Sequence, residues 1–213
     1  MDEVQRMITL TKIENELRRQ GYRLVAGIDE AGRGPLAGPV IASACILPEK
    51  FNLPGLNDSK KLTEKKREDL AYRIKEQAVA FSLGSATSKE IDLLNILKAT
   101  LLAMKRALEN LQPTPDYILI DGRDNLNTPI LHKTMVGGDG LCACIAAASI
   151  LAKVARDELM CEMNEIYPEY CFDRHKGYGT RLHLDTIYQF GPCPIHRQSF
   201  SPIKEIVSQN RIG

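Results

Sequence analysis

The sequence predicts an α/β fold in which a sheet domain carries a helical appendage at its C-terminus. Strand patterns come first along the chain, helical patterns then alternate with further strands, and only short helical patterns follow Pro168. The chain has 213 residues, of which 44% are hydrophobic and 26% are charged. A chain of this size and composition buries a real core without disulfides or metals.

Composition also narrows the class of protein. The longest uncharged stretch, 34–48, contains three prolines, so no membrane span fits, and residues 1–20 lack the apolar centre of a signal peptide. The six cysteines form no C-x-x-C pair, which is typical of reduced thiols in the cytoplasm. A net charge of +1 excludes binding of nucleic acid by bulk charge alone, although not through a locally basic groove. We therefore expect a cytoplasmic monomer.

Local signals place the individual elements. A helix is expected over 12–19 with Gly21 as its stop, and Thr63 is a candidate N-cap for a helix that runs to about residue 77. Ser88 caps a long helix to about Leu111, whose leucines follow a helical period. Strands are expected at 23–28, 40–47, 79–86, 117–120 and 131–136, and further helices at 141–166, 180–189 and 203–209.

Two of these strands end in acidic residues, Asp29 and Glu30 after the first and Asp121 after the fourth. Such acids often form turns or helix caps. Carboxylates gathered at one sheet edge repel one another, however, and an all-oxygen site suits Mg²⁺ or Mn²⁺. Since consecutive strand residues point to opposite faces, we expect the strand to break or bulge at Asp29 and Glu30, with Gly32 and Gly34 favouring the break.

The segment Gly32-Arg33-Gly34 formally begins a G-x-G-x-x-A dinucleotide fingerprint. Prolines and a strand follow it where the fingerprint requires a helix, so an NAD(P)-dependent oxidoreductase is a weak alternative. Close approach of the glycine backbone to a ligand is the better interpretation.

Two further segments have ligand-binding character. Ser149, Lys153 and Asp157 are spaced four apart on a small-residue helix, where a surface stripe is the simpler interpretation. The loop 174–180 combines cations, glycines and Tyr178, as do loops that contact and stack on nucleic acid, although it could simply be a solvated loop. Segment 57–61 is a candidate phosphate contact.

In combination, six segments in order resemble the ribonuclease HII family, the bacterial type 2 ribonuclease H. They are GIDEAGRGPLAGPV at 27–40, NDSKKL at 57–62, LIDG at 119–122, AAASILAKVARD at 146–157, HKGYGT at 175–180 and HRQSF at 196–200. The resemblance implies a ribonuclease H-like fold, a central mixed five-stranded sheet flanked by helices, with a helical C-terminal region. It predicts a catalytic domain over 1–166, including the helical segment 1–21, and a substrate-binding loop with short helices over 167–213 packed on the same domain.

Carried over by position, the resemblance assigns the metal-binding and catalytic carboxylates to Asp29, Glu30, Asp121 and Asp157, and the loop acid Asp139 stays open. It further implies substrate-binding residues: ribose 2′-hydroxyl recognition by the backbone of Gly32, Arg33 and Gly34, support from Tyr178, and phosphate contacts by Ser59, Lys60, Ser149 and Lys153.

The resemblance also implies an activity. It predicts hydrolysis of RNA in RNA–DNA hybrids and cleavage 5′ of single ribonucleotides in duplex DNA, with two Mg²⁺ or Mn²⁺ ions and with 5′-phosphate and 3′-hydroxyl products. Its cellular role would be the removal of misincorporated ribonucleotides and RNA primers. The related ribonuclease HIII family, which usually has an additional N-terminal domain, and a non-catalytic nucleic-acid-binding module are the alternatives.

Overall fold

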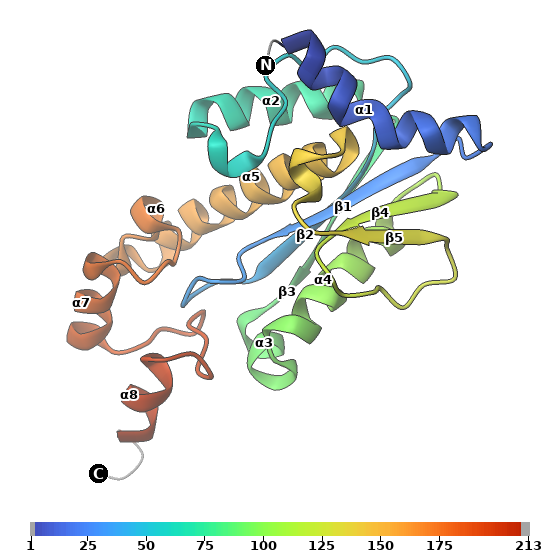
Figure 1. Cartoon of the computed structure of the whole chain (residues 1–213). Coiled ribbons are helices and arrows are strands. Elements are labelled where there is room, and N and C mark those ends of the chain that lie inside the picture. The colour runs from blue at the N-terminus through green and yellow to red at the C-terminus, as the bar shows by residue number, and fades with distance from the viewer. Residues whose placement is uncertain (1–2, 210–213) are drawn as a thin grey trace.

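A five-stranded mixed sheet forms the centre of the molecule (Figure 1). The computed structural model describes residues 3–209. The strand order is β3-β2-β1-β4-β5, in which β1–β2 and β2–β3 pair antiparallel and β1–β4 and β4–β5 pair parallel. The strands are β1 (Val25–Ala31), β2 (Val40–Ile46), β3 (Ala80–Ala86), β4 (Tyr117–Asp121) and β5 (His132–Met135).

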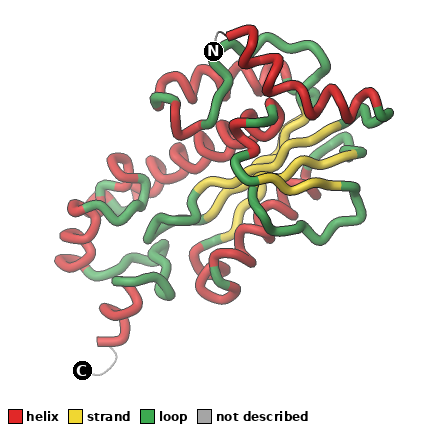
Figure 2. Tube along the Cα trace, viewed as in Figure 1, coloured by secondary structure: helices red, strands yellow, loops and turns green. Residues whose placement is uncertain are grey.

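Helices cover both faces of this sheet, and the C-terminal helices extend beyond one end of it (Figure 2). One face packs on α4, and the other packs on α5 with α1 and α2 outside it. The helices are α1 (Glu3–Arg19), α2 (Glu64–Gln77), α3 (Ser88–Leu94), α4 (Ile96–Asn110), α5 (Ala143–Ile166), α6 (Phe172–His175), α7 (Arg181–Phe190) and α8 (Ile203–Gln209), with short 3-10 turns at Ser59–Lys61, Gly138–Gly140 and Pro168–Tyr170.

Helix α5 is the element that brings functional side chains to the sheet. It approaches β1 so closely that a Cβ atom on Gly27 would collide with the backbone of Cys144 and Ile145. Its N-terminus has no side-chain cap of its own, but the buried carboxylate of Glu14 in α1 accepts a hydrogen bond from the Cys144 N–H at 2.7 Å. A carboxylate at a helix N-terminus is favourable because it satisfies free N–H groups and complements the helix dipole.

Most predicted elements are confirmed, including all five strands and the Thr63 N-cap of α2. The single long helix expected from Ser88 is wrong. Asn95 adopts φ 71° and divides it into α3 and α4, and the cap is Thr87, which forms a reciprocal capping box with Glu90. Asparagine is one of the few residues that tolerate positive φ, which explains the break at this position. The short helix α6 was not predicted.

One carboxylate of the sheet domain binds the C-terminal segment at several atoms. Asp92 in α3 accepts hydrogen bonds from the backbone N–H groups of Gln198 and Ser199 and from the Ser199 hydroxyl, at 2.6–2.9 Å. A third apolar cluster, centred on Phe172, fills the space between α5 and the C-terminal helices. Within the described residues, no helix is long and apolar enough to cross a bilayer.

Candidate active site

Asp29 and Asp121 lie side by side at the ends of two neighbouring strands. The parallel register pairs Ile28 with Ile120, so the two aspartates follow in adjacent positions on the same face of the sheet. That face is the α5 face, because Gly27, two residues before Asp29, contacts α5. Burial, followed by the neighbouring charges of Glu30 and Asp121, raises the pKa of Asp29 well above its usual value, while a hydrogen bond from Ser149 opposes that rise.

Glu30 reaches the same edge from the opposite face. Strand β1 continues without a bulge to Ala31, so the expected break at Asp29 and Glu30 is wrong, and the chain turns only at Gly32, where φ is +99°. The Glu30 carboxylate lies 3.4 Å from the Arg33 guanidinium. Burial raises the pKa of Glu30, Arg33 opposes this, and Asp121 adds to it. The two acids therefore flank Asp121 although they belong to opposite faces.

A fourth carboxylate comes from the turn before α5. Asp139 is buried in the 3-10 turn Gly138–Gly140, and the Gly138 N–H donates to Asp121 Oδ1 at 2.7 Å, which brings the turn against β4. Burial, together with the charges of Asp58 and Asp121, raises the pKa of Asp139. We call Asp29, Glu30, Asp121 and Asp139 the acid cluster.

Lys60, in the loop before α2, is a cation that interacts electrostatically with the acid cluster. Burial lowers its pKa, but the carboxylates of Asp139, Asp29, Asp58 and Asp121 together raise it. Its side chain remains exposed to solvent.

The carboxylates of the acid cluster are engaged in hydrogen bonds within the protein. Asp29 Oδ1 accepts from the Glu30 N–H at 2.7 Å, and Asp121 accepts from Gly138. Among residues 3–209, no three His, Cys, Asp or Glu side chains are arranged so as to hold a metal ion. Binding of a cation would therefore require these carboxylates to exchange protein donors for the ion.

Asp157, the fourth ligand implied by the resemblance, has different neighbours. Lys153 donates to Asp157 Oδ1 at 2.6 Å, and the Arg67 guanidinium lies 3.8 Å from Oδ2. Asp157 is eight residues beyond Ser149, the α5 residue level with Asp29, and eight residues of helix span about 12 Å. The contacts that bring Asp29, Glu30 and Asp121 together do not include Asp157. Asp139, which the sequence left open, has the neighbours expected of the fourth acid.

The two serines expected to contact phosphate are buried and bonded to each other. Ser59 Oγ lies 3.0 Å from Ser149 Oγ, and both residues are less than 5% exposed. Because Ser149 also hydrogen-bonds Asp29, the pair supports that carboxylate from behind. Their burial leaves no surface for a phosphate, and we revise their expected role accordingly.

The segment 32–39 is supported from beneath by two buried arginines that the sequence analysis did not single out. Arg156 Nε and Nη2 donate to the carbonyls of Pro39 and Ala37, each at 3.1 Å. Arg197 donates to the carbonyls of Gly38, Arg33 and Gly32 at 2.5–3.0 Å. We call Arg156 and Arg197 the arginine pair; both are 0% exposed.

Burial, and then its Arg156 neighbour, lowers the pKa of Arg197 to about 9, and burial likewise lowers the pKa of Arg156. The two segments AKVAR and HRQSF carry these arginines far apart in the sequence. No local signal in the sequence identifies the pair, because only the fold brings both arginines next to the glycine-rich segment.

Gly32 and Gly34 have different surroundings. A Cβ atom on Gly32 would collide with Arg156, whereas one on Gly34 would meet only the Tyr178 ring, at 3.8 Å. Tyr178 is 43% exposed, and its ring lies 5.9 Å from both Lys153 Nζ and the Arg156 guanidinium. The structure thus brings Gly34, Tyr178 and Lys153 together.

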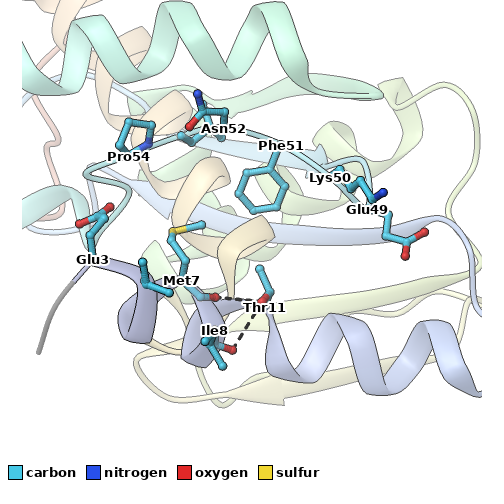
Figure 3. A pocket seen from close by; sticks show the side chains of 11 residues that line it. Glu3, Met7, Ile8, Thr11, Glu49, Lys50, Phe51, Asn52 and Pro54 are labelled. Atoms are coloured by element: carbon cyan, nitrogen blue, oxygen red, sulfur yellow. Dashed lines mark hydrogen bonds between the residues drawn. The ribbon is translucent and has the colours of Figure 1, made fainter.

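A separate cavity of about 430 Å³ opens between α1 and the segment 49–54 (Figure 3). Its lining is largely apolar, with Met7, Ile8 and Phe51 in the middle and Glu3 and Glu49 at its margins. The Thr11 hydroxyl in its wall donates to backbone carbonyls of the same helix. The cavity has no convergent catalytic groups, so the acid cluster is the candidate active site.

Comparisons with known proteins identify the family of the chain. A family model described as ribonuclease HII matches residues 26–203. Ribonuclease HII of Desulfitobacterium hafniense (strain DSM 10664 / DCB-2) is 58% identical over 95% of this chain and 78% of its own length. Ribonuclease HII of Chlamydia pneumoniae is 50% identical over 97% of this chain and 96% of its own length.

Solved structures show the same architecture. The crystal structure of ribonuclease H2 from Pyrococcus horikoshii OT3 has a TM-score of 0.73 at 28% identity, over 89% of this chain and 99% of that one. The Mn²⁺ complex of Bst-RNase HIII has a TM-score of 0.66 at 17% identity, over 92% of this chain and 73% of that one, and at this identity it supports the fold alone.

Proposed function

The chain belongs to the ribonuclease HII family of metal-dependent endonucleases, and we propose that it hydrolyses the RNA strand of RNA–DNA hybrids and cuts duplex DNA on the 5′ side of single ribonucleotides. The observation that carries the proposal is the acid cluster, which gathers buried carboxylates at the end of β1 and β4. We propose ribonucleotide excision and primer removal as its cellular role, and the cytoplasm as its location.

The donor chemistry of the acid cluster fits a pair of hard divalent cations. Four carboxylates at one edge of the sheet supply oxygen ligands and excess negative charge, which is what Mg²⁺ and Mn²⁺ require, and burial with neighbouring carboxylate charge raises the pKa of Asp29 and Asp139. We propose that Asp29, Glu30, Asp121 and Asp139 hold the ions, with Asp139 in the place that the resemblance gave to Asp157. When bound, divalent ions there supply an activated water and stabilise the leaving 3′-oxygen.

The remaining residues would position the substrate. The arginine pair holds the carbonyls of segment 32–39 inward, which leaves the backbone N–H groups of Arg33 and Gly34 available to the ribose 2′-hydroxyl. Tyr178 would pack on the neighbouring sugar, and Lys60 and Lys153 would face phosphates. We also propose that residues 1–166 form the catalytic unit, with 167–213 as a substrate-binding part packed on it.

A cleavage map tests this proposal. Duplex DNA with one ribonucleotide and an RNA–DNA hybrid are incubated with Mg²⁺, Mn²⁺ or chelator, and the end groups of the products are determined. We expect divalent-dependent cuts that leave a 3′-hydroxyl and a 5′-phosphate, including one cut 5′ of the single ribonucleotide. Strong cleavage of the hybrid with little cleavage at the single ribonucleotide would instead favour a ribonuclease HIII-like activity. No metal-dependent cleavage of either substrate would overturn the proposal.

A further inference from the structure

Hydrogen bonds of the backbone, rather than of the side chain, position the ring of Tyr178. Its ring is exposed and its hydroxyl makes no hydrogen bond with the residues that the structure describes, yet the ring lies against Gly34. Several backbone hydrogen bonds hold the loop around it: the Leu36 N–H donates to the Gly177 carbonyl at 2.8 Å, and the Tyr178 N–H donates to the His175 carbonyl at 2.9 Å. The Tyr178 carbonyl accepts from the Thr180 N–H at 2.8 Å and also lies 2.9 Å from His183 Nδ1, the one side chain of residues 3–209 that holds it. The position of the ring therefore depends in part on His183.

A chain of hydrogen bonds leads from that carbonyl into the core of the C-terminal lobe. His183 Nε2 lies 3.0 Å from His196 Nε2, and the Cys193 N–H donates to His196 Nδ1 at 2.9 Å. We call His183 and His196 the histidine pair. Both rings are 2% exposed or less, and Phe172 packs against each of them.

The groups at the two ends of this series of hydrogen bonds determine which ring nitrogen of each histidine carries the proton. A backbone N–H can only donate, so the shorter contact, from the Cys193 N–H, makes His196 Nδ1 the acceptor and places the proton on Nε2, although the Cys193 carbonyl also lies 3.3 Å from Nδ1. That proton is then donated to His183 Nε2, which leaves the His183 proton on Nδ1, where it faces the Tyr178 carbonyl. The Cys193 thiol, 3.1 Å from His196 Nδ1, is compatible with the same tautomer. The arrangement is consistent only when both rings are neutral.

Burial keeps them neutral. Desolvation lowers the pKa of His183 to about 4, and desolvation together with the proximity of His183 lowers the pKa of His196 to about 4. His175, stacked on His183 at 4.4 Å between ring centroids, is held separately by the Tyr170 carbonyl and the Gly177 N–H. Near neutral pH, His183 is thus a fixed N–H donor toward the substrate loop.

We propose that the histidine pair are positioning residues that set the place of the Tyr178 ring over Gly34, and hence the selectivity for a ribonucleotide junction, by donating to the Tyr178 backbone carbonyl. The inference rests on the proposed function, since the selectivity concerns its substrates. Neither histidine touches the substrate; each acts through the next group in the chain. Two hydrogen bonds therefore connect the buried His196 ring to the Tyr178 carbonyl, and through it to specificity.

Two substitutions of His183 separate positioning from packing. In His183→Asn the amide nitrogen takes the place of Nδ1 and can still donate to the Tyr178 carbonyl, whereas in His183→Gln the amide lies farther out, near the place of Nε2. Both remove the ring and its packing. The measurement is kcat/KM on the single-ribonucleotide duplex divided by kcat/KM on the hybrid, taken well below the melting temperature of each variant.

We expect His183→Gln to lower this ratio about 10-fold and His183→Asn to leave it within about 3-fold of the wild-type ratio. His132→Gln is the control, since the His132 ring lies in the edge strand β5 and, among residues 3–209, hydrogen-bonds only the Ile130 carbonyl. An equal change of the ratio in both His183 variants, or no change in either, overturns the proposal.

A spectroscopic measurement covers the case in which a variant does not fold. Nitrogen NMR of the wild-type histidines should show a proton on Nδ1 of His183 and on Nε2 of His196; the opposite tautomers would overturn the proposal. The two failures are distinguishable. Wild-type protein that cleaves neither substrate refutes the proposed function, whereas wild-type cleavage with an unmoved ratio in His183→Gln refutes only the role of the histidine pair.

Discussion

The acid cluster and the arginine pair are two neighbouring regions, each of which gathers charges of one sign. The two regions differ in how the protein compensates those charges. No carboxylate of the described residues lies within ion-pair distance of either buried arginine, but five backbone carbonyls accept their hydrogen bonds. The acid cluster has no comparable set of donors, and neighbouring carboxylates add to the burial that raises the pKa of Asp29 and Asp139. Burying charge is costly unless it is compensated. Backbone carbonyls compensate most of the arginine charge, with Arg156 Nη1 left without a partner among the described residues, whereas much of the cost of burying the acids remains.

The largest effect should come from removing one charge of the acid cluster. Asp29→Asn is nearly isosteric but lacks the anionic oxygen, and we expect metal-dependent cleavage to fall at least about 10³-fold. Binding of an uncleaved substrate should persist, because loss of a negative charge does not weaken attraction to phosphate. Single-turnover cleavage and a binding titration measure the two quantities. Near-normal turnover would show that the acid cluster is structural, like the arginine pair.

The arginine pair should respond in stability first. Arg197→Met keeps most of the side-chain volume but leaves the carbonyls of Gly32, Arg33 and Gly38 without their donor. At about 1 kcal/mol for each lost hydrogen bond, we expect about 3 kcal/mol of destabilisation. Urea unfolding measures it, with the exposed Arg181→Met as the control. A loss of activity without a loss of stability would mean that Arg197 acts on the substrate directly.

The choice of the fourth acid can be tested by a matched pair of variants. Asp139→Asn should reduce cleavage about 10²-fold if Asp139 belongs to the acid cluster. Asp157→Asn, which removes a partner of Lys153 and Arg67, should reduce it only a few-fold. Steady-state kinetics at saturating Mg²⁺ distinguishes the two. The reverse order would restore the assignment that the resemblance alone implied.

The two glycines give a smaller contrast. Gly32→Ala introduces a Cβ atom at φ +99° against Arg156 and should lower the melting temperature. Gly34→Ala meets only the edge of Tyr178, so we expect a wild-type melting temperature with about 10-fold weaker cleavage at a single ribonucleotide. Melting curves and kinetics on the same samples check both. Full activity of Gly34→Ala would exclude close approach of the substrate at this glycine.

The smallest effect should be the dependence of stability on pH without metal. The folded-state pKa values of Asp29, Glu30 and Asp139 are raised, so these acids favour the folded state most when protonated and lose that contribution as pH rises through the raised values. These acids alone would make the metal-free protein more stable as pH falls from 7 toward 5, whereas the histidine pair, with pKa values of about 4, opposes that trend. Added Mg²⁺ should raise the melting temperature most at the higher pH. Asp29→Asn should weaken both trends.

Local signals were enough to predict the strands and the three acids at two strand ends, because a buried strand followed by Asp or Asp-Glu is visible in consecutive residues. Asp139 could not be preferred over Asp157 on sequence alone, since its proximity to Asp121 depends on how the turn before α5 docks on β4. The break at Asn95 was missed because the leucine period continues across it. The burial of Ser59 against Ser149 is likewise a long-range contact without a local signal.

Through Glu14, helix α1 influences the candidate active site although α1 lies away from it. Its carboxylate is the only side chain among the described residues that accepts a hydrogen bond from the N-terminal turn of α5, the helix that also carries Ser149 and Lys153. A substitution of Glu14 would displace or fray the N-terminal turn of α5, next to Asp139. A substitution in α1, on the outside of the molecule, would then lower the measured cleavage activity. A search for variants with reduced activity should therefore include α1.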